Sequence, residues 1–378
     1  MQRDPGHNER QRLESGLSSL HGLDRIREAA GATPVYLVGG AVRDLLLGRT
    51  DRSDVDIVVE GEVGPIAAAL GGEARSHERF GTAKVQAGEL IADLAAARAE
   101  SYSYPGALPE VRPATLADDL ARRDFTINAM AVPLSGEPQL IDPHGGRADL
   151  DSGLLRVLHE RSFADDPTRA LRAARYAARF SFALDPETER VLRDADLTTV
   201  SADRVEAELR KLAAEHEARR GFELLDAWGL LAIAEERAKL IESVLAVVES
   251  PGWEGVADRR DVVLAAARDE LGDAERLARA EPQRASEAVD LARGREGVEL
   301  ALARALGGEW LDRYVTEWRH VGLEISGEDL LAAGVPESPA LGRGLRVALA
   351  RKLDGEIAGR EAELAAALEA AREGPGPA

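Results

Sequence analysis

The pattern of apolar and polar residues changes near residue 150. Before that point, short apolar runs with strand-like character alternate with helix-like segments: PVYLV, AVRDLLLG, DVDIVVE, AKVQAG and ELIADLA. Beyond Asp151, Ala, Leu, Glu and Arg recur in amphipathic order, which is typical of packed helices. The sequence therefore predicts the α+β class, with an N-terminal α/β domain followed by an all-α region.

Length and turn signals divide the chain further. Its 378 residues exceed the usual size of one compact domain. We expect a flexible leader over 1–18, the α/β domain over 19–150, a first helical domain over 151–218 and further helices over 219–378. Neither the polar leader nor the terminal GPGPA is expected to carry function. Clusters of Gly, Pro and Ser predict breaks near Ser181–Pro186, Ser250–Gly255 and Gly334–Pro339.

Composition narrows the chemistry. The chain has no cysteine, which excludes disulfides, thiolate metal sites and cysteine nucleophiles. Its N-terminus lacks the apolar stretch of a secretory signal, and no apolar run is long enough to cross a membrane, so we expect a cytoplasmic protein. The formal charge of −20 argues against nonspecific binding of nucleic acid, but a local basic stripe can coexist with acidic helices elsewhere.

A glycine pair separates the first predicted strand from a short helix. Gly39 and Gly40 follow the apolar run, and Gly48 closes the helix. Glycines allow a ligand to approach the backbone closely, and the new helix favours an anion at its N-terminus. Arg43 is then placed to bind phosphates. A tight turn without a ligand is the alternative, and is the commoner case for such a pair.

Two aspartates follow in the next predicted strand. Because side chains alternate along a strand, Asp54 and Asp56 share one face while Val55 and Ile57 share the other. Two neighbouring carboxylates suit a hard cation such as Mg²⁺, and a paired-metal site catalyses in-line displacement at phosphorus. The alternative is an acidic turn entering a strand. Asp93 is either a third carboxylate of this site or a solvated residue at a strand end.

Several segments together resemble one family, the class II tRNA nucleotidyltransferases, which add CCA to tRNA 3′ ends and share ancestry with bacterial poly(A) polymerases. The resemblance covers about residues 35–211. It is carried by YLVGGAVRDLLLG with DVDIVV, LARRDFTINAMAV, IDPHGGRADLDSGLLR, ADDPTRALRAARYAARF and SADRVEAELRKL. It implies a nucleotidyltransferase head domain over 19–150, a neck over 151–218 that selects the nucleotide, and a body and tail from 219 that bind tRNA.

The resemblance also implies roles for individual residues. Asp54 and Asp56 match metal ligands, and Gly40 and Arg43, beside Gly39, match nucleotide contacts. Arg123 resembles a triphosphate contact and Asp124 a ribose contact, with Asn128 beside them. The implied cofactor is Mg²⁺, and the implied substrates are CTP, ATP and tRNA. We expect no membrane partner and a monomer or homodimer.

The base-reading pair that we predict is Asp166 and Arg169. Cytosine and adenine both present an amino donor beside a ring-nitrogen acceptor, so one acceptor and one set of donors can accept both bases. At i and i+3 on a helix, Asp166 and Arg169 would share a face. Alternatively, Asp166 is an N-cap followed by Pro167.

Further arginines follow at helical spacing. We expect Arg172 and Arg175 to lie with Arg169 at the nucleotide, and Arg179 to be structural. The family usually has Glu where this chain has Asp165, so the helix-orienting role of that first acid is in doubt. No His-Asp pair is found, so we expect no phosphohydrolase domain.

The rival functions differ mainly in what they add to RNA. A poly(A) polymerase would prefer ATP alone, and HERFGTAKV resembles the CCA-adding form more closely. Enzymes that add only CC or only A share every motif quoted. The segment Arg98–Thr115, where the family has a flexible loop that helps switch from C to A, favours full CCA addition. A non-catalytic RNA-binding relative or a small-molecule nucleotidyltransferase would not need the complete set of motifs.

Overall fold

The computed structural model describes residues 5–49, 54–71 and 81–372. Residues 1–4 of the expected leader, part of the HERFGTAKV segment and the terminal GPGPA lie outside the described residues. The chain forms two compact units. The first extends to Leu212 and includes Leu224–Leu230, and the second contains Ala213–Glu223 and continues from Leu231.

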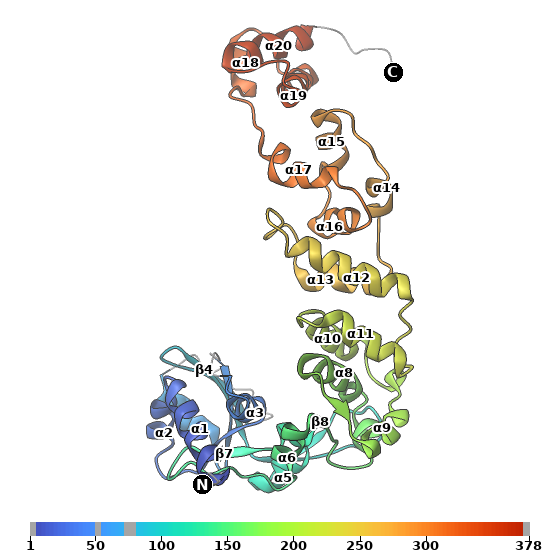
Figure 1. Cartoon of the computed structure of the whole chain (residues 1–378). Coiled ribbons are helices and arrows are strands. Elements are labelled where there is room, and N and C mark those ends of the chain that lie inside the picture. The colour runs from blue at the N-terminus through green and yellow to red at the C-terminus, as the bar shows by residue number, and fades with distance from the viewer. Residues whose placement is uncertain (1–4, 50–53, 72–80, 373–378) are drawn as a thin grey trace. The chain divides into compact units, whose positions relative to one another are not determined.

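A mixed five-stranded sheet forms the centre of the first unit (Figure 1). Its strands, in spatial order, are β3 (Thr82–Ala87), β4 (Leu90–Ala96), β2 (Asp54–Val59), β1 (Val35–Val38) and β7 (Ala131–Pro133). The β2–β4 pair is parallel, and the other neighbours are antiparallel. A separate hairpin is formed by β5 (Arg98–Ser101) and β6 (Glu110–Pro113), and a short parallel pair by β8 (Leu154–Leu155) and β9 (Ala183–Leu184).

The central strand β2 has two different faces. Val55, Ile57 and Val59 are buried in the main core of the unit. On the other face, Asp54 and Asp56 are exposed, while Val58 is buried in a smaller apolar cluster with residues of α5 (Leu116–Ala121). The predicted period of two is therefore confirmed, and both aspartates lie on the face that the main core does not cover.

Helices pack around the sheet and make up most of the rest of the first unit. They are α1 (Pro5–Ser19), α2 (Leu23–Ala30), α3 (Gly40–Leu46), α4 (Val63–Ala69), α5, α6 (Gly146–Ser152), α7 (Ser162–Asp165), α8 (Thr168–Phe180), α9 (Pro186–Val191) and α10 (Ala202–Ala213). Single 3₁₀ turns occur at η1 (Thr126–Asn128), η2 (Leu192–Asp194) and η3 (Leu197–Thr199).

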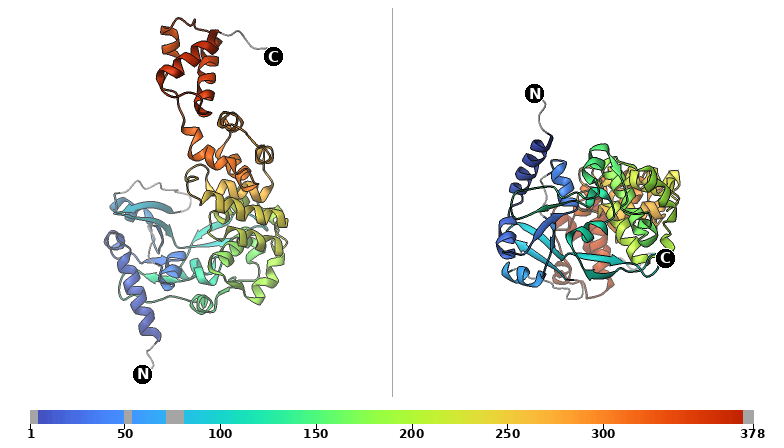
Figure 2. Two further views of the ribbon diagram at one scale, coloured as in Figure 1. Left: turned by 45° about the horizontal axis from the view of Figure 1, so that its top comes forward. Right: turned by 90° about the horizontal axis from the view of Figure 1, so that it is seen from below.

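The N-terminal segment differs from the flexible leader that we expect. Residues Pro5–Ser19 form α1 (Figure 2, dark blue). Leu13 is 1% exposed within the main core, and a Cβ at Gly16 would lie 2.8 Å from Cδ2 of Leu45 in α3. Because Leu13, Leu17 and Leu20 recur at helical spacing, this segment buries one apolar face against the unit.

The second unit is helical throughout its described residues (Figure 1, yellow to red). Its helices, including the shared α11, are α11 (Ala218–Ala227), α12 (Glu235–Val248), α13 (Arg259–Arg268), α14 (Ala274–Ala278), α15 (Ala285–Ala292), α16 (Gly297–Ala305), α17 (Trp310–Thr316), the 3₁₀ turn η4 (Trp318–His320), α18 (Gly327–Ala332), α19 (Pro339–Leu353) and α20 (Arg360–Arg372). None of the helices in the described ranges has both the length and the apolar character needed to cross a bilayer. The α+β class is confirmed.

The three predicted breaks all fall between helices. Helix α8 ends at Phe180 and α9 begins at Pro186, with Ser181 at positive φ between them. Helix α12 ends before the second break, and α18 ends before the third. The pair β8–β9 was not predicted, because strands of two residues are too short to produce a periodic pattern.

Candidate active site

The first unit contains a cleft of about 890 Å³. Its lining comes from the β1–α3 turn, strands β2 to β5, the segment after α5, helix α8 and helix α10. Among the described residues that line it, ten are basic and six are acidic. A local basic surface therefore exists within a strongly acidic chain, as expected from the arginines of α8.

Two of the three predicted carboxylates lie side by side in the cleft. Asp56 of β2 and Asp93 of β4 are register partners in the parallel pair, and both line the cleft. Asp54 is exposed on the same face but lies outside the residues that line the cleft. Exposed carboxylate oxygens on one face are the donors that Mg²⁺ prefers, so the chemistry of this set fits that ion.

The Asp93 carboxylate is paired with a lysine. Lys84 Nζ lies 3.0 Å from each of its two oxygens. Nowhere in the described ranges do three or more acidic or histidine side chains converge closely enough to hold a metal ion. The three aspartates thus share a face without forming a closed cage.

Gly39 lies against the guanidinium of Arg123. Gly39 has φ +68°, and a Cβ there would be 2.6 Å from Nη1 of Arg123. Arg123 is held by Asp119, which is fully buried and accepts from Arg123 Nη2 at 2.9 Å and from Arg122 at 2.6 Å. The Nε of Arg123 is buried and has no hydrogen-bond partner among the described residues. This fixed cation beside the glycine turn is suited to an anionic ligand.

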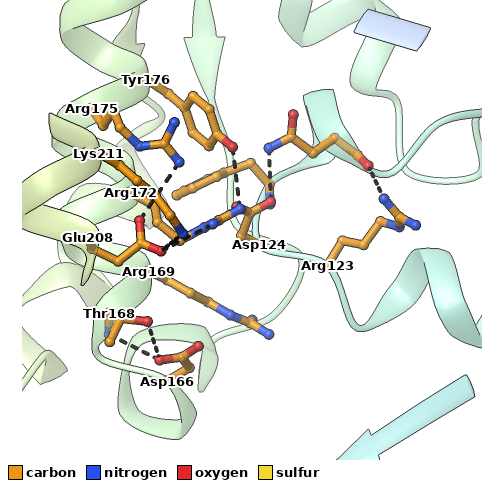
Figure 3. Close-up of polar contacts among 12 residues, drawn as sticks. Arg123, Asp124, Asp166, Thr168, Arg169, Arg172, Arg175, Tyr176, Glu208 and Lys211 are labelled. Carbon is orange, nitrogen blue, oxygen red and sulfur yellow. Dashed lines mark hydrogen bonds and ion pairs between the residues drawn. The ribbon is translucent and has the colours of Figure 1, made fainter. Parts of the chain in front are cut away.

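Asp124 is buried and accepts three hydrogen bonds (Figure 3). Its Oδ1 accepts from Phe125 N and Asn128 Nδ2, both at 2.9 Å, and its Oδ2 accepts from Arg172 Nε at 2.7 Å. The Nη2 of Arg172 also lies 2.6 Å from Oδ2, so the two side chains form a close ion pair. Burial opposes ionisation, but the charge of Arg172 and these hydrogen bonds lower the pKa of Asp124 well below its usual range. The same pairing raises the pKa of Arg172.

Arg43 is almost fully buried, yet it is among the residues that line the cleft. It is 2% exposed, and it donates to Asn128 Oδ1 at 2.6 Å and to Asp44 Oδ1 at 2.9 Å. Its guanidinium also lies over the rings of Tyr176 and Phe180, at 5.4 and 4.6 Å. Arg43 therefore orients Asn128, which in turn donates to Asp124. These contacts do not use all the N–H donors of the guanidinium.

Asp166 does not share a helix with Arg169. It lies in extended conformation between α7 and α8, because the residue before Pro167 is sterically excluded from the helical region. Its Oδ1 accepts from Thr168 N and Oγ1 (Figure 3) and from Arg204 Nη2 at 2.9 Å. The predicted helix-capping contact is therefore present, one residue earlier than a standard N-cap, and all three described hydrogen bonds use the same oxygen.

Arg169 is the first arginine of α8 and is 4% exposed. It donates to Ser162 Oγ at 2.6 Å and to the carbonyl of Arg122 at 2.8 Å. A guanidinium carries more N–H donors than these two contacts use, and Arg169 lines the cleft beside Asp166. The two residues thus come together, although not through helical spacing.

The remaining arginines of α8 also line the cleft. Glu208 of α10 lies 3.6 Å from Arg172 and 3.8 Å from Arg175. Arg179, expected to be structural, lines the cleft as well, with its guanidinium 6.0 Å from the Phe180 ring. The predicted stripe of arginines is therefore present on one face of α8.

Three important residues are absent from the sequence-based prediction. Asp119 could have been found, because it lies at i−3 and i−4 from Arg122 and Arg123. Arg204 and Glu208 could not, because their partners are distant in sequence. Arg204 donates to the carbonyl of Gly106 at 3.0 Å as well as to Asp166, and so connects α10 to the hairpin loop.

The segment Arg98–Thr115 forms the β5–β6 hairpin, and its loop contacts the end of α7 and helix α10. The N–H of Gly106 donates to the carbonyl of Asp165 at 3.2 Å. Tyr102 lines the cleft, and burial together with the charges around it raises the pKa of Tyr102 to about 12. The carbonyl of Asp165 and the carboxylate of Asp166 are thus both tied to this loop, directly or through Arg204.

Comparisons with known proteins agree with this geometry. Residues 35–156 match the poly(A) polymerase head domain, and residues 181–236 match a domain described as the probable RNA- and SrmB-binding site of polymerase A. The CC-adding tRNA nucleotidyltransferase of Deinococcus radiodurans is 37% identical over 340 residues, covering 85% of each chain. The A-adding enzyme of Halalkalibacterium halodurans is 44% identical over 206 residues, 51% of this chain. The chain spans less than half of that relative, 48% of its length.

A solved structure covers nearly the whole chain. The Thermotoga maritima CCA-adding enzyme complexed with tRNA has a TM-score of 0.72 and 29% identity, covering 98% of this chain and 99% of that one. The sequence identity with the Deinococcus enzyme extends over most of both proteins. This chain therefore belongs to the class II tRNA nucleotidyltransferase and poly(A) polymerase family.

Proposed function

We propose that the protein transfers nucleotides from CTP and ATP to the 3′ end of tRNA. The observation that carries the proposal is one cleft in which Asp56 and Asp93 lie beside Arg123 and the arginines of α8. In the reaction, the 3′-hydroxyl oxygen of the RNA forms a bond to the α-phosphorus, and the bond from that phosphorus to pyrophosphate breaks. The same cleft supplies acidic oxygens for a metal ion and cations for a triphosphate.

Asp54, Asp56 and Asp93 would hold Mg²⁺. When bound, this ion would supply electrostatic stabilisation of the attacking and leaving oxygens. Arg123 would offset the negative charge of the triphosphate, and its position is fixed by Asp119 and by the absence of a side chain at Gly39. In this proposal the carboxylates bind the metal ion and Arg123 binds the triphosphate.

We propose positioning roles for Asp124 and Arg43. A carboxylate has about four lone-pair sites, and three hydrogen bonds together with the ion-pair contact of Arg172 Nη2 take up most of those of Asp124. We therefore replace the ribose contact implied by resemblance with a role in holding Arg172. Arg43, through Asn128, would support the same contacts.

Base selection would use Asp166 and Arg169. The three described hydrogen bonds of Asp166 go to Oδ1, which leaves Oδ2 as an acceptor for the exocyclic amino group of C or A. Arg169 would donate to the ring nitrogen beside it. On their pairing edges, uracil and guanine present the opposite pattern of donors and acceptors. Their binding would leave buried polar groups unpaired, which lowers the affinity.

We favour full CCA addition over addition of CC or A alone. The support is the hairpin loop, which is present and reaches both Asp165 and Arg204. The solved structures that match nearly the whole chain include a CCA-adding enzyme in complex with ATP and one with CTP. Addition of A alone is the second candidate, because about half of the chain, 51%, aligns with an A-adding relative at 44% identity.

One experiment separates these functions. Transcripts of tRNA ending before CCA, ending in CC, and complete are each incubated with CTP, with ATP, and with both. Full addition predicts three added nucleotides on the first transcript and one on the second. Addition to the second transcript only would identify an A-adding enzyme, and two nucleotides on the first transcript only would identify a CC-adding enzyme. Extension of complete tRNA or of unrelated RNA with ATP would favour a poly(A) polymerase.

A further inference from the structure

Lys84 lies in a row with two of the proposed metal-binding carboxylates. It is the register partner of Asp93 in the antiparallel β3–β4 pair, and Asp93 is the register partner of Asp56 in the parallel β4–β2 pair. Side chains at directly paired positions project from the same face of a sheet. All three residues line the cleft.

The ion pair between Lys84 and Asp93 is close but accessible. The Lys84 Nζ lies 3.0 Å from both oxygens of Asp93, and the two side chains are 59% and 53% exposed. Contacts of this kind between exposed groups are weak, about 1 kcal/mol or less. A divalent cation can therefore displace the ammonium group.

A lysine is unusual in this chain. The sequence has 48 basic residues, and only four are lysines: Lys84, Lys211, Lys239 and Lys352. Unlike the planar guanidinium, an ammonium group is a compact point charge on a flexible stem, and it imposes little geometry on its partner. Lys84 is thus able to hold Asp93 and to release it.

The geometry also explains why the aspartates do not form a closed metal cage. Within the described ranges, no three acidic or histidine side chains converge on one point. Since Asp93 directs both oxygens to Lys84, it can join Asp56 around a cation only when that pair opens.

We propose that Lys84 is a positioning residue that competes with the divalent cation for Asp93. The inference rests on the proposed metal-dependent function. The ammonium group holds the Asp93 carboxylate in place on the sheet before the cation binds, and it weakens cation binding because the two positive charges compete for the same oxygens. Removing the ammonium group should therefore tighten cation binding by about two- to fivefold, the range set by the strength of an exposed ion pair.

The test is direct binding of Mn²⁺ to the full-length protein, measured from the electron paramagnetic resonance signal of the free ion. Lys84→Met keeps the length of the side chain and removes its charge, and should bind Mn²⁺ two- to fivefold more tightly than the wild type. Lys84→Arg keeps the charge and should stay closer to the wild type than Lys84→Met. Lys239→Met is the matched control, because it removes a lysine that is paired with an exposed carboxylate, Glu235 at 2.7 Å, outside the residues that line the cleft, and it should not change affinity.

A double-mutant cycle shows whether the effect passes through Asp93. In an Asp93→Asn background, Lys84→Met should change the affinity by less than it does in the wild type. Unchanged affinity in Lys84→Met, or an equal gain in both backgrounds, would overturn the inference. Wild-type binding that is unaffected by Asp56→Asn would instead overturn the proposed metal site, and the inference with it.

Discussion

Arg172 donates from Nε to Oδ2 of Asp124 at 2.7 Å, and its Nη2 lies 2.6 Å from the same oxygen. This pair joins helix α8 to the segment that follows α5, which is more than forty residues earlier in the chain. Asp124 is 8% exposed, and the loss of Arg172 would leave this buried carboxylate without its counter-charge. The pair thus positions the arginines of α8 relative to Arg123.

We predict that Arg172→Met lowers both stability and activity. The free energy of unfolding should fall by about 3 kcal/mol, because Asp124 would remain buried and lose its counter-charge. Urea unfolding and nucleotide incorporation measure the two effects. Asp124→Asn combined with Arg172→Met should recover part of the stability. A single variant as stable as the wild type would contradict the importance of the pair.

A second prediction concerns the contact between Gly39 and Arg123. Gly39→Ala should raise the KM for CTP and ATP about tenfold or more, because the new methyl group would displace the guanidinium. Gly48→Ala is the control, since Gly48 has a similar φ of +73° but no atom within 4 Å of its Cβ position. Gly48→Ala should lose about 1 kcal/mol of stability from strain and keep its KM. Equal KM values in the two variants would show that Arg123 does not bind the substrate.

Arg204 should control base selection without contacting the base. Arg204→Met removes the donor that holds Asp166 and the loop carbonyl of Gly106. We expect the incorporation of UTP and GTP, relative to that of CTP and ATP, to rise about tenfold. This factor corresponds to the free energy of roughly one hydrogen bond to a charged group. Arg210→Met, on the same helix, serves as the control. Preserved selectivity in Arg204→Met would place base recognition elsewhere.

The half-buried Tyr102, which follows strand β5, gives a prediction about pH. Burial raises the pKa of Tyr102 to about 12, from an ordinary value near 10. A group whose pKa is higher in the folded protein stabilises the fold below its unfolded pKa, and this contribution is lost as pH rises from about 10 to about 12. Tyr102→Phe should therefore lose less stability than the wild type across this range in thermal melts. If the two proteins lost stability equally as pH rises, ionisation of Tyr102 would not be the cause of the loss.

The fold was predictable where the chain carries a local signal. Alternation along Asp54–Val59 predicted β2 and its two faces, and Gly48 correctly marked the end of α3. The N-terminal helix was not predicted, because the polar composition of its first residues outweighed the spacing of its leucines. The hairpin β5–β6 has mixed polar strands without clear alternation, which gives no periodic signal.

The candidate site was predictable as a list of residues but not as an arrangement. Sequence motifs identified Arg43 and Asp166, yet they did not show that Arg43 is buried against Asn128 or that Pro167 keeps Asp166 outside the helix. Contacts such as Arg204 with Gly106 join residues 98 positions apart, and no local pattern reports them. Burial and contacts between residues far apart in the sequence decide which side chains can bind the nucleotide and which ones hold other side chains in position.

The most direct test of the central claim is the rate of nucleotide addition to tRNA lacking its CCA end, measured under single-turnover conditions with labelled CTP and ATP. Asp56→Asn should slow incorporation at least about a hundredfold. Its unfolding midpoint should stay unchanged, because Asp56 is exposed. Asp24→Asn, which changes an aspartate that is 83% exposed on α2, should leave the rate at the wild-type value. Incorporation by Asp56→Asn at the rate of the wild type would contradict the account.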